Sequence, residues 1–255
     1  VNNDGLYNVY DGDYPEIKGD QMVWMCFNDK TSHEQSNGNM LEFNLEIEIY
    51  TYDCVGDPTI NGSFFAHFDI KNMANERADS IFMGFFTDFD LGCYTDDYLG
   101  VLPDVNTFYA YNATANDADC LDVNGFGSQI PVQSITFLNR ELSHFTPMFI
   151  GSGGSIPMGA NQPILPNEYY NYLTGTWRDG TPLTYGGTGY NPGSSDVVPI
   201  AFPDNPSDPQ GWSMCNNSFP AVYDFTSVAS HGPFVLQPTQ TFSMGLAFTF
   251  HPDIE

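Results

Sequence analysis

Apolar and polar residues alternate along residues 40–52, MLEFNLEIEIYTY. One set of alternate positions is apolar and consists of Leu41, Phe43, Leu45, Ile47 and Ile49. The set between them is polar and consists of Glu42, Asn44, Glu46 and Glu48. Because successive side chains of a strand point to opposite faces, the pattern predicts a strand with one buried face. A helix of this sequence would scatter the apolar residues around its circumference.

Shorter apolar runs predict further strands. They cover residues 22–27, 63–70, 81–86, 107–111, 134–138, 197–202, 221–225, 234–236 and 241–250. Gly, Pro, Asn and Asp separate these runs and supply the turns between them. Helical periodicity is scarce, and residues 167–173 after Pro166 form the one short segment that predicts a helix. Many short strands without alternating helices predict an all-β fold, an antiparallel sandwich or barrel.

We expect a β-sandwich of the Ig-like or jelly-roll-like kind, with long Gly/Pro/Tyr-rich loops and little helix. Residues 21–255 are assigned to this single domain, and residues 1–20 to a separate polar, turn-rich segment with the spacing of a calcium loop. Within the domain, residues 139–196 are rich in Gly, Pro and Tyr. This stretch is too aromatic for a disordered linker, so we interpret it as an insertion packed by its aromatic rings.

The charge balance narrows the classes of partner. The 255 residues include 32 acidic and 6 basic side chains, which gives a formal net charge of −26. Nucleic acids and anionic membrane surfaces are recognised by clustered Lys and Arg, so we expect no nucleic-acid partner and no binding to such membranes. No segment approaches the roughly 20 apolar residues of a membrane span, so we expect no direct membrane insertion. We therefore expect the excess of Asp and Glu side chains to solvate the surface, to bind cations, or to do both.

The N-terminal segment fits the spacing of a calcium-binding loop, which places oxygen ligands at alternate positions and a Gly at its sharp turn. In the matching register the ligands are Asn2, Asp4, the carbonyl of Leu6, Asn8 and Asp11. Gly5 then lies at the turn, and the first ligand position falls before Val1. The alternative is an Asn-Asp-Gly turn that holds no ion.

The second candidate cation site is residues 87–100, TDFDLGCYTDDYLG. Its acids are Asp88, Asp90, Asp96 and Asp97. Asp88 and Asp90 share a face if the preceding strand continues, and Gly92 allows the loop to turn back toward the other two acids. Converging carboxylates without a basic partner repel one another, and a hard cation that prefers oxygen removes this penalty. We therefore expect calcium here, against the alternative of a solvated acidic loop.

Five cysteines are present, and none forms a Cys-x-x-Cys pair, so a structural zinc site is poorly supported. Cys93 and Cys120 lie in loop-like sequence and are the pair we expect to form a disulfide, although spacing alone leaves other pairings open. Cys26 and Cys54 lie beside apolar runs and are equally compatible with buried free thiols. A bond between residues 93 and 120 would bring a third acidic stretch beside the second site. Its acids are Asp117, Asp119 and Asp122.

Catalytic motifs are scarce. The sequence contains no Gly-x-Ser-x-Gly elbow and no His-Glu-x-x-His spacing among its five histidines. A Ser-His-Asp triad stays open because its members need not be adjacent in sequence. Residues 169–190 hold five Tyr side chains and one Trp, which either pack the insertion or form a sugar-binding surface. Paired carboxylates are compatible with glycoside hydrolysis, but with 32 acids such pairs arise in any fold.

Five segments, in order along the chain, carry a family resemblance. They are VNNDGLYNVYDGDYPEIKGDQMVWMCFND, DSIFMGFFTDFDLGCYTDDYLG, NEYYNYLTGTWRDGTPLTYGGTGYNPGSSD, FPDNPSDPQGWSM and HGPFVLQPTQTF. The chain resembles a β-rich module of large secreted Bacteroidota surface proteins, which are type IX secretion substrates. The opening of that module is similar to a dockerin-like calcium repeat. Two positions depart from its usual form, because Phe89 stands where Pro is common and Cys93 where an acidic or polar residue is common.

The resemblance implies an extracellular or outer-cell-surface location and a place within a longer polypeptide. It implies calcium as the cofactor and transfers no catalytic residue. We therefore expect a non-catalytic, calcium-stabilised module with a structural, adhesive or filament-forming role. Its expected partners are other domains of the same polypeptide, with self-association into fibres or binding to surface glycan as further options. The alternative function is a carbohydrate-binding module or glycoside hydrolase.

Overall fold

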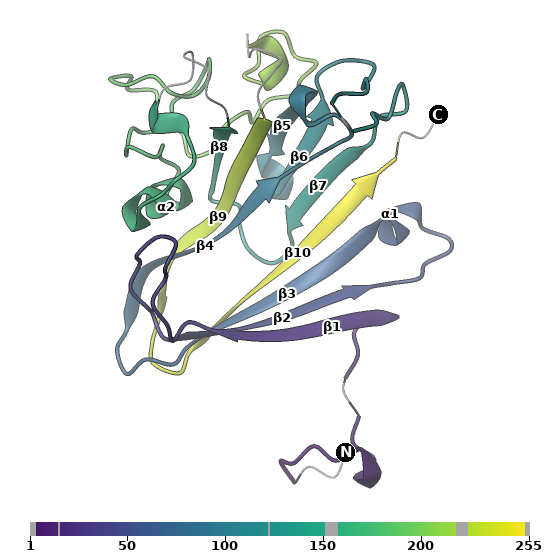
Figure 1. Ribbon diagram of the computed structural model, residues 1–255, viewed down its shortest axis with the longest axis vertical. Helices are drawn as coiled ribbons and strands as arrows, with labels where there is room; N and C mark the ends of the chain where they lie inside the picture. The colour runs from purple at the N-terminus through teal and green to yellow at the C-terminus, as the bar shows by residue number, and fades with distance from the viewer. Residues whose placement is uncertain (1–3, 15, 122, 151–157, 218–223, 253–255) are drawn as a thin grey trace.

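The computed structural model describes residues 4–14, 16–121, 123–150, 158–217 and 224–252 (Figure 1). Within these ranges ten strands form two antiparallel sheets, which pack as a sandwich with two α-helices beside them. The expected all-β antiparallel sandwich is therefore confirmed. The longer helix has eight residues, and no helix in the described ranges is long and apolar enough to cross a membrane.

Seven strands form the larger sheet. In spatial order they are β1 (Gln21–Asn28), β2 (Phe43–Thr51), β3 (Ser63–Asn72), β10 (Thr241–His251), β7 (Val132–Phe137), β6 (Thr107–Asn112) and β5 (Asp97–Leu102). Every pair of neighbours in this sheet is antiparallel. The two edge strands of the larger sheet are therefore β1 and β5.

Three strands form the smaller sheet. In spatial order they are β4 (Ala78–Asp88), β9 (Asp224–Leu236) and β8 (His144–Ile150). Phe85 of β4 contacts Phe68 of β3 and Phe137 of β7 edge to face. Phe145 of β8 packs on Phe108 of β6, and both rings are fully buried. These rings fill the core between the two sheets.

The strand predicted from the alternation at residues 40–52 is present as β2. Leu45, Ile47 and Ile49 pack against the core. Glu46 and Glu48 lie between them in sequence and therefore on the outer face of the sheet. The register with β1 and β3 continues without a shift along the strand, as expected for a regular pleated strand.

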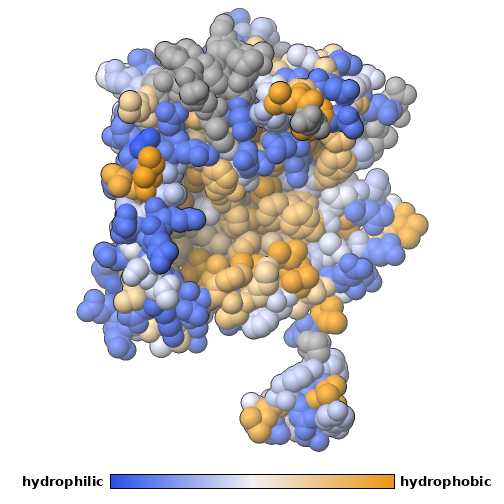
Figure 2. Space-filling view, in the orientation of Figure 1, coloured by the Kyte–Doolittle hydropathy of each residue, from blue (hydrophilic) through white to orange (hydrophobic). Residues whose placement is uncertain are grey.

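The larger sheet extends beyond the smaller one on its β1 side (Figure 1). Ile47 and Ile49 of β2 are accordingly half-buried, whereas Phe108 of β6, under the smaller sheet, is fully buried. Figure 2 shows apolar residues gathered in the hollow above β1, β2 and β3. This part of the apolar face is therefore only partly covered by the rest of the described chain.

Two short α-helices accompany the sheets, α1 (Pro58–Asn61) and α2 (Pro166–Leu173). The second confirms the predicted helix. The Glu168 carboxylate accepts the backbone N–H of Leu165 at the start of α2 and pairs with Arg178 at 3.1 Å. Leu173 at its end packs against Gly84 of β4, where a larger residue would collide with it. This contact holds α2 on the outer face of the smaller sheet.

Two strands lie outside the predicted runs. β5 begins within the acidic segment interpreted as a metal loop and extends past its end, and β8 falls within the predicted insertion. Pro147 interrupts the apolar run of β8, and its missing N–H is tolerated because β8 is an edge strand. The strand predicted at residues 197–202 is instead two isolated bridges, at Val197 and Ile200. The described residues between β8 and β9 form no strand.

Candidate metal centre

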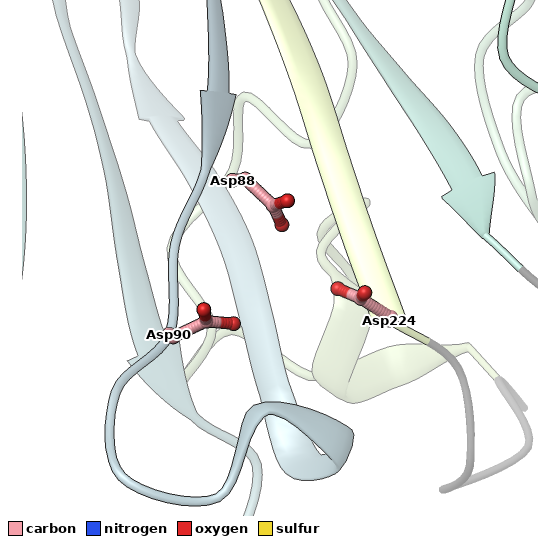
Figure 3. A group of neighbouring side chains, drawn as sticks. All are labelled: Asp88, Asp90 and Asp224. Carbon is pink, nitrogen blue, oxygen red and sulfur yellow. The ribbon is translucent and has the colours of Figure 1, made fainter.

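Three aspartates converge at one end of the smaller sheet (Figure 3). Asp88 is the last residue of β4, Asp90 follows in the next loop, and Asp224 is the first residue of β9. Each offers one carboxylate oxygen, and these oxygens lie within 4.8 Å of one another. In the part of the chain that the structure describes, this is the one such group of three or more His, Cys, Asp or Glu residues.

The pairing of β4 with β9 explains this convergence. Asp88 lies opposite Thr226 in the antiparallel register. Continuing that register by two residues brings Asp90 opposite Asp224. Residues directly opposite, and those two positions further along, have side chains on the same face of the sheet. The three carboxylates are therefore placed together by the strand register, although β9 is far away in sequence.

Burial and mutual repulsion make the negative charges of these three carboxylates unfavourable, so protonation or a bound cation would stabilise the group. Burial, and then the charges of Asp88 and Asp90, raise the pKa of Asp224 to about 6. Burial, and then the charge of Asp90, raise the pKa of Asp88. Oδ1 of Asp224 is buried and has no hydrogen-bond partner among the described residues. None of the ion pairs in the described ranges reaches these three aspartates.

The group has the ligand chemistry of a hard divalent cation. Calcium binds carboxylate oxygens at about 2.3–2.6 Å, so two of its ligands lie at most about 5 Å apart. The separation of up to 4.8 Å between the three oxygens is within this limit. Asp88 and Asp90 are exposed, which leaves room for water to complete the coordination. These residues therefore fit calcium, with three protein oxygens and the remaining ligands from solvent.

Asp96 and Asp97 lie outside this group of three. Asp97 begins β5 and is 3% exposed, and its Oδ2 accepts the N–H of Leu91 at 2.7 Å. Burial is the main cause that raises the pKa of Asp97 to about 8. Asp96 accepts a hydrogen bond from Asn112 at 3.2 Å, and burial raises its pKa as well. Gly92, with φ of +67°, turns the loop back toward them as expected.

The predicted disulfide between Cys93 and Cys120 is present. It brings the third acidic stretch beside the loop that follows β4. Asp117 is 1% exposed, and its two oxygens accept the N–H groups of Cys93 at 3.1 Å and Phe126 at 2.7 Å. Asp117 therefore ties the two loops together through the backbone. Asp119 accepts the N–H of Gly125 at 3.0 Å.

The other three cysteines form no disulfide. Cys26 and Cys54 are free thiols, as one of the two interpretations expected, but Cys26 is exposed and Cys54 is half-buried. Cys215 is also free and exposed. Asp122 lies outside the described residues.

The N-terminal calcium-loop ligands are placed only in part. Asn2 lies outside the described residues. Asp4 accepts the N–H of Leu6 at 2.8 Å, as in an Asx turn. Asp11 accepts a hydrogen bond from the Asn8 amide at 2.6 Å. Neither Asp4 nor Asp11 belongs to a group of three acids within the described ranges.

Asp224 is the site residue that the sequence analysis missed. It stands in the run AVYDF, residues 221–225, which predicted a strand. The sequence shows only a single carboxylate next to the apolar residues of a predicted strand. Asp224 could be assigned to the site only if the pairing of that strand with the one ending at Asp88 were known, and no local pattern specifies which distant strands pair.

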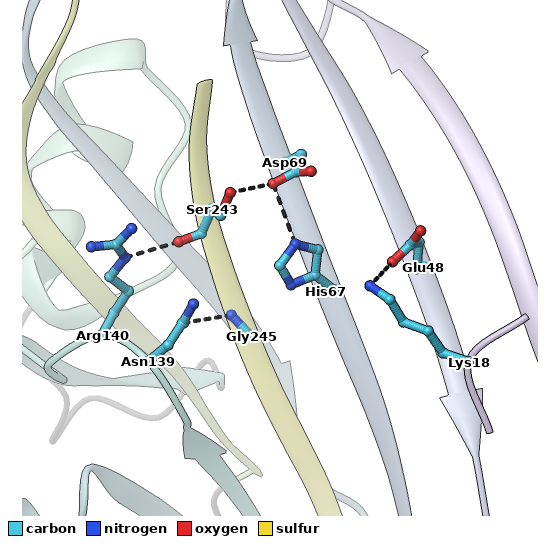
Figure 4. A network of polar contacts seen from close by, with 8 residues as sticks. All are labelled: Lys18, Glu48, His67, Asp69, Asn139, Arg140, Ser243 and Gly245. Carbon is cyan, nitrogen blue, oxygen red and sulfur yellow. Dashed lines mark hydrogen bonds and ion pairs between the residues drawn. The ribbon is translucent and has the colours of Figure 1, made fainter. Parts of the chain in front are cut away.

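A second polar cluster lies on the outer face of the larger sheet (Figure 4). The Ser243 hydroxyl donates to Asp69, and His67 Nε2 lies 3.3 Å from the same carboxylate. The carboxylate thus stands between the Ser and the His. Activation of a Ser nucleophile requires a direct hydrogen bond from its hydroxyl to the His. This trio therefore lacks the order of a catalytic triad.

The neighbours of this cluster tie strands and loops together. Arg140 Nε donates to the carbonyl of Ser243 at 2.8 Å, and the N–H of Gly245 donates to Asn139 at 2.7 Å. Lys18 pairs with Glu48 on the same face of the sheet. These contacts attach the β7–β8 loop and the segment before β1 to the sheet.

The aromatic segment 169–190 mixes buried and exposed rings. Trp177 is fully buried, and its indole N–H donates to the carbonyl of Gly189 at 2.8 Å. Tyr172 is also buried, whereas Tyr169 and Tyr185 are exposed by 42% and 49%. Packing, the favoured interpretation, therefore describes part of the segment. Tyr169 belongs to α2, and its exposed ring is compatible with the sugar-binding alternative for the surface beside that helix.

No protein-family model matches the chain, and a search among curated proteins finds no match.

Proposed function

We propose that the chain is a non-catalytic, calcium-stabilised module of a secreted or cell-surface bacterial protein, with a structural or adhesive role. The observation that carries this proposal is the convergence of Asp88, Asp90 and Asp224 within 4.8 Å. A cation among these carboxylates offsets their mutual repulsion and the cost of burying part of Asp224.

The position of the group supports a stabilising role. Asp88 ends β4, and Asp224 begins β9, so an ion bound there clamps two paired strands at the point where they part. An ion that binds only the folded chain stabilises it by mass action. With three protein ligands, an affinity near that of extracellular calcium modules, on the order of 10⁻⁴–10⁻³ M, is expected.

Two further observations support an extracellular setting. The Cys93–Cys120 disulfide is of a kind that persists mainly in oxidising compartments. The net charge of −26 keeps the chain soluble where salt and divalent ions screen it. The resemblance to modules of secreted Bacteroidota proteins leads to the same location, with other domains of one polypeptide as neighbours.

Isothermal titration with calcium tests the proposal. We expect one binding event for the wild-type chain that is weakened at least tenfold in Asp224→Asn. Asp104 is an exposed acid in the turn Pro103–Val105, and Asp104→Asn is the matched control that should leave binding unchanged. Absence of binding to the wild-type chain, or equal weakening by both variants, would contradict the site.

Glycan binding is the second candidate function. A cavity of about 390 Å³ lies between α2 and the outer face of β4, and its lining includes Phe86, Tyr169 and Gln162. Aromatic faces next to an amide are the chemistry that binds sugar rings. Titration with soluble gluco- and manno-oligosaccharides tests it. Binding that Tyr169→Ala abolishes and Tyr185→Ala leaves intact would support the cavity, and no binding would count against it.

A further inference from the structure

The candidate metal centre and the cavity beside α2 lie on the same face of the smaller sheet. On β4, Asp88 follows Phe86 by two residues, and on β9, Val228 follows Asp224 by four. Residues an even number of positions apart in a strand share a face. Phe86 and Val228 both line the cavity. The acids of Figure 3 are therefore neighbours of the cavity, about 7 Å away along β4.

The pairing across the strands leads to the same conclusion. Thr226 of β9 lies opposite Asp88 of β4 on one side and opposite Met148 of β8 on the other. Met148 lines the cavity. Residues directly opposite one another in a ladder have their side chains on the same face. Thr226 therefore stands between the acids and the cavity.

Buried polar atoms without partners follow this strip of the sheet. Thr226 is fully buried, and its hydroxyl makes no hydrogen bond to the described residues. The same is true of the buried Oδ1 of Asp224, two residues away on the same face. Thr146 of β8, opposite Val228, has a third hydroxyl of this kind. Because buried polar groups in native proteins are nearly always paired, this strip has the character of a site for an ion and a polar ligand.

The cavity itself carries accessible aromatic rings. Phe86 and Tyr169 are exposed by 55% and 42%. Gln162 adds an exposed amide to the lining. Rings beside polar groups suit a sugar, which has both apolar faces and hydroxyls. The volume of about 390 Å³ lies near the lower end of the range for ligand sites, and it therefore favours the end of a glycan over a long chain.

A calcium ion bound by the three aspartates has ligand positions to spare. Calcium takes about six to eight oxygen ligands, and one oxygen from each aspartate leaves several positions open. The three carboxylates outweigh the two positive charges of the ion, and the chain as a whole carries −26. An anionic ligand is therefore repelled. Neutral oxygens, such as the hydroxyls of a sugar, fit the open positions.

We propose that the calcium and the cavity together form one sugar site, which rests on the calcium-binding function proposed above. Two adjacent hydroxyls of a neutral sugar take two open positions on the ion, and the sugar ring packs against Phe86 at the edge of the cavity. The ion then both stabilises the strands and holds the ligand. The adhesive role thereby acquires a ligand class, a glycan end that binds only in calcium.

Saturation-transfer NMR on the full chain tests the calcium dependence. The probes are methyl α-mannoside, methyl β-galactoside and methyl α-fucoside, which all carry adjacent hydroxyls. In millimolar calcium we expect at least one of them to bind. Its affinity should fall at least tenfold in chelator and in Asp224→Asn, and it should be unchanged in Asp104→Asn. Binding of none of the three probes, or equal binding in calcium and in chelator, overturns the proposal.

Phe86→Ala separates the sugar from the ion. The Phe86 side chain is largely exposed, so the variant should fold and should bind calcium within about twofold of the wild-type affinity. Its affinity for the probe sugar should fall at least tenfold. Phe27 is 52% exposed on β1 of the larger sheet, and Phe27→Ala is the matched control. Equal sugar affinities of the two variants overturn the placement of the ring.

Europium luminescence tests the contact between the sugar and the ion. Eu³⁺ replaces calcium in oxygen sites, and its luminescence lifetimes in H₂O and D₂O count the water molecules bound to it. When the probe sugar binds, this count should fall by about two, one for each hydroxyl. An unchanged count with the sugar bound overturns the shared site and leaves the calcium with a stabilising role alone. Failure of the wild-type chain to bind calcium in the titration described above would overturn the proposed function as well.

Discussion

Oxygens of Asp88 and Asp224 lie within 4.8 Å of each other because one residue ends β4 where the other begins its neighbour β9. The same register places Asp90 at the next step. A cation that binds these three side chains therefore acts on the junction of two paired strands.

The first prediction concerns Gly92. Its φ of +67° disfavours any other residue, and a Cβ there would overlap the Asp117 carboxylate. Gly92→Ala should therefore lower the free energy of unfolding by about 3 kcal/mol or more in urea denaturation. Gly127 has the same φ of +67° with no atom near the added Cβ, so Gly127→Ala isolates the backbone strain. That control should cost about 1–2 kcal/mol. Equal losses would show that the close approach to Asp117 contributes nothing.

The second prediction concerns pH. Burial raises the pKa of Asp97 in the folded chain to about 8, above its ordinary value of 3.8. The folded state therefore holds this proton more tightly than the unfolded state, so this contribution to stability is fully present below about pH 4. It is lost as the pH rises through 8. In metal-free protein we expect the free energy of unfolding to fall between pH 5 and pH 9 by about 1 kcal/mol or more.

Asp97→Asn is the variant that tests this assignment. Asn resembles the protonated acid, and its side-chain oxygen still accepts the N–H of Leu91. The decline of stability with pH should therefore be shallower than in the wild-type chain, as urea denaturation at several pH values would measure. Asp104→Asn should leave the slope unchanged. A wild-type slope that persists in Asp97→Asn would assign the effect to other carboxylates.

The third prediction concerns the aromatic insertion. Trp177 is fully buried and donates to the carbonyl of Gly189, so Trp177→Phe removes both volume and a hydrogen bond. We expect a loss of about 1–3 kcal/mol in the free energy of unfolding. Tyr185 is 49% exposed, and Tyr185→Phe should cost less than about 1 kcal/mol in the same measurement. A negligible effect of Trp177→Phe would argue that the insertion folds without this anchor.

Periodic patterns predicted the parts of the fold that local sequence determines. The alternation of Leu45, Ile47 and Ile49 with glutamates specified β2 and its buried face. The sequence analysis did not predict β8, because Pro147 interrupts its apolar run. A Pro is tolerated at this position because β8 is an edge strand of the sheet. The sequence analysis did not predict β5, because an Asp such as Asp97 at its start is typical of a loop and its burial is not evident from the sequence.

The candidate site was predicted in part for a related reason. Asp88 and Asp90 stand two positions apart at the end of a predicted strand, and this local spacing was enough to nominate them. Asp224 depends on the pairing of β4 with β9, which is a contact between distant parts of the sequence. Asp96 and Asp97 were predicted as ligands because they lie close to Asp88 and Asp90 in the sequence. The sequence does not show that one Asp97 oxygen already accepts a hydrogen bond from a backbone N–H, that of Leu91.

The most direct test of the account is the melting temperature of the wild-type chain in 10 mM calcium and in chelator. At about 10–100 times the dissociation constant, mass action gives roughly 1.4–2.7 kcal/mol, which corresponds to a rise of about 3–10 °C for a chain of this size. We predict this rise for the wild-type chain and for Asp104→Asn, and its loss in Asp224→Asn. Identical melting curves with and without calcium for the wild-type chain would contradict it.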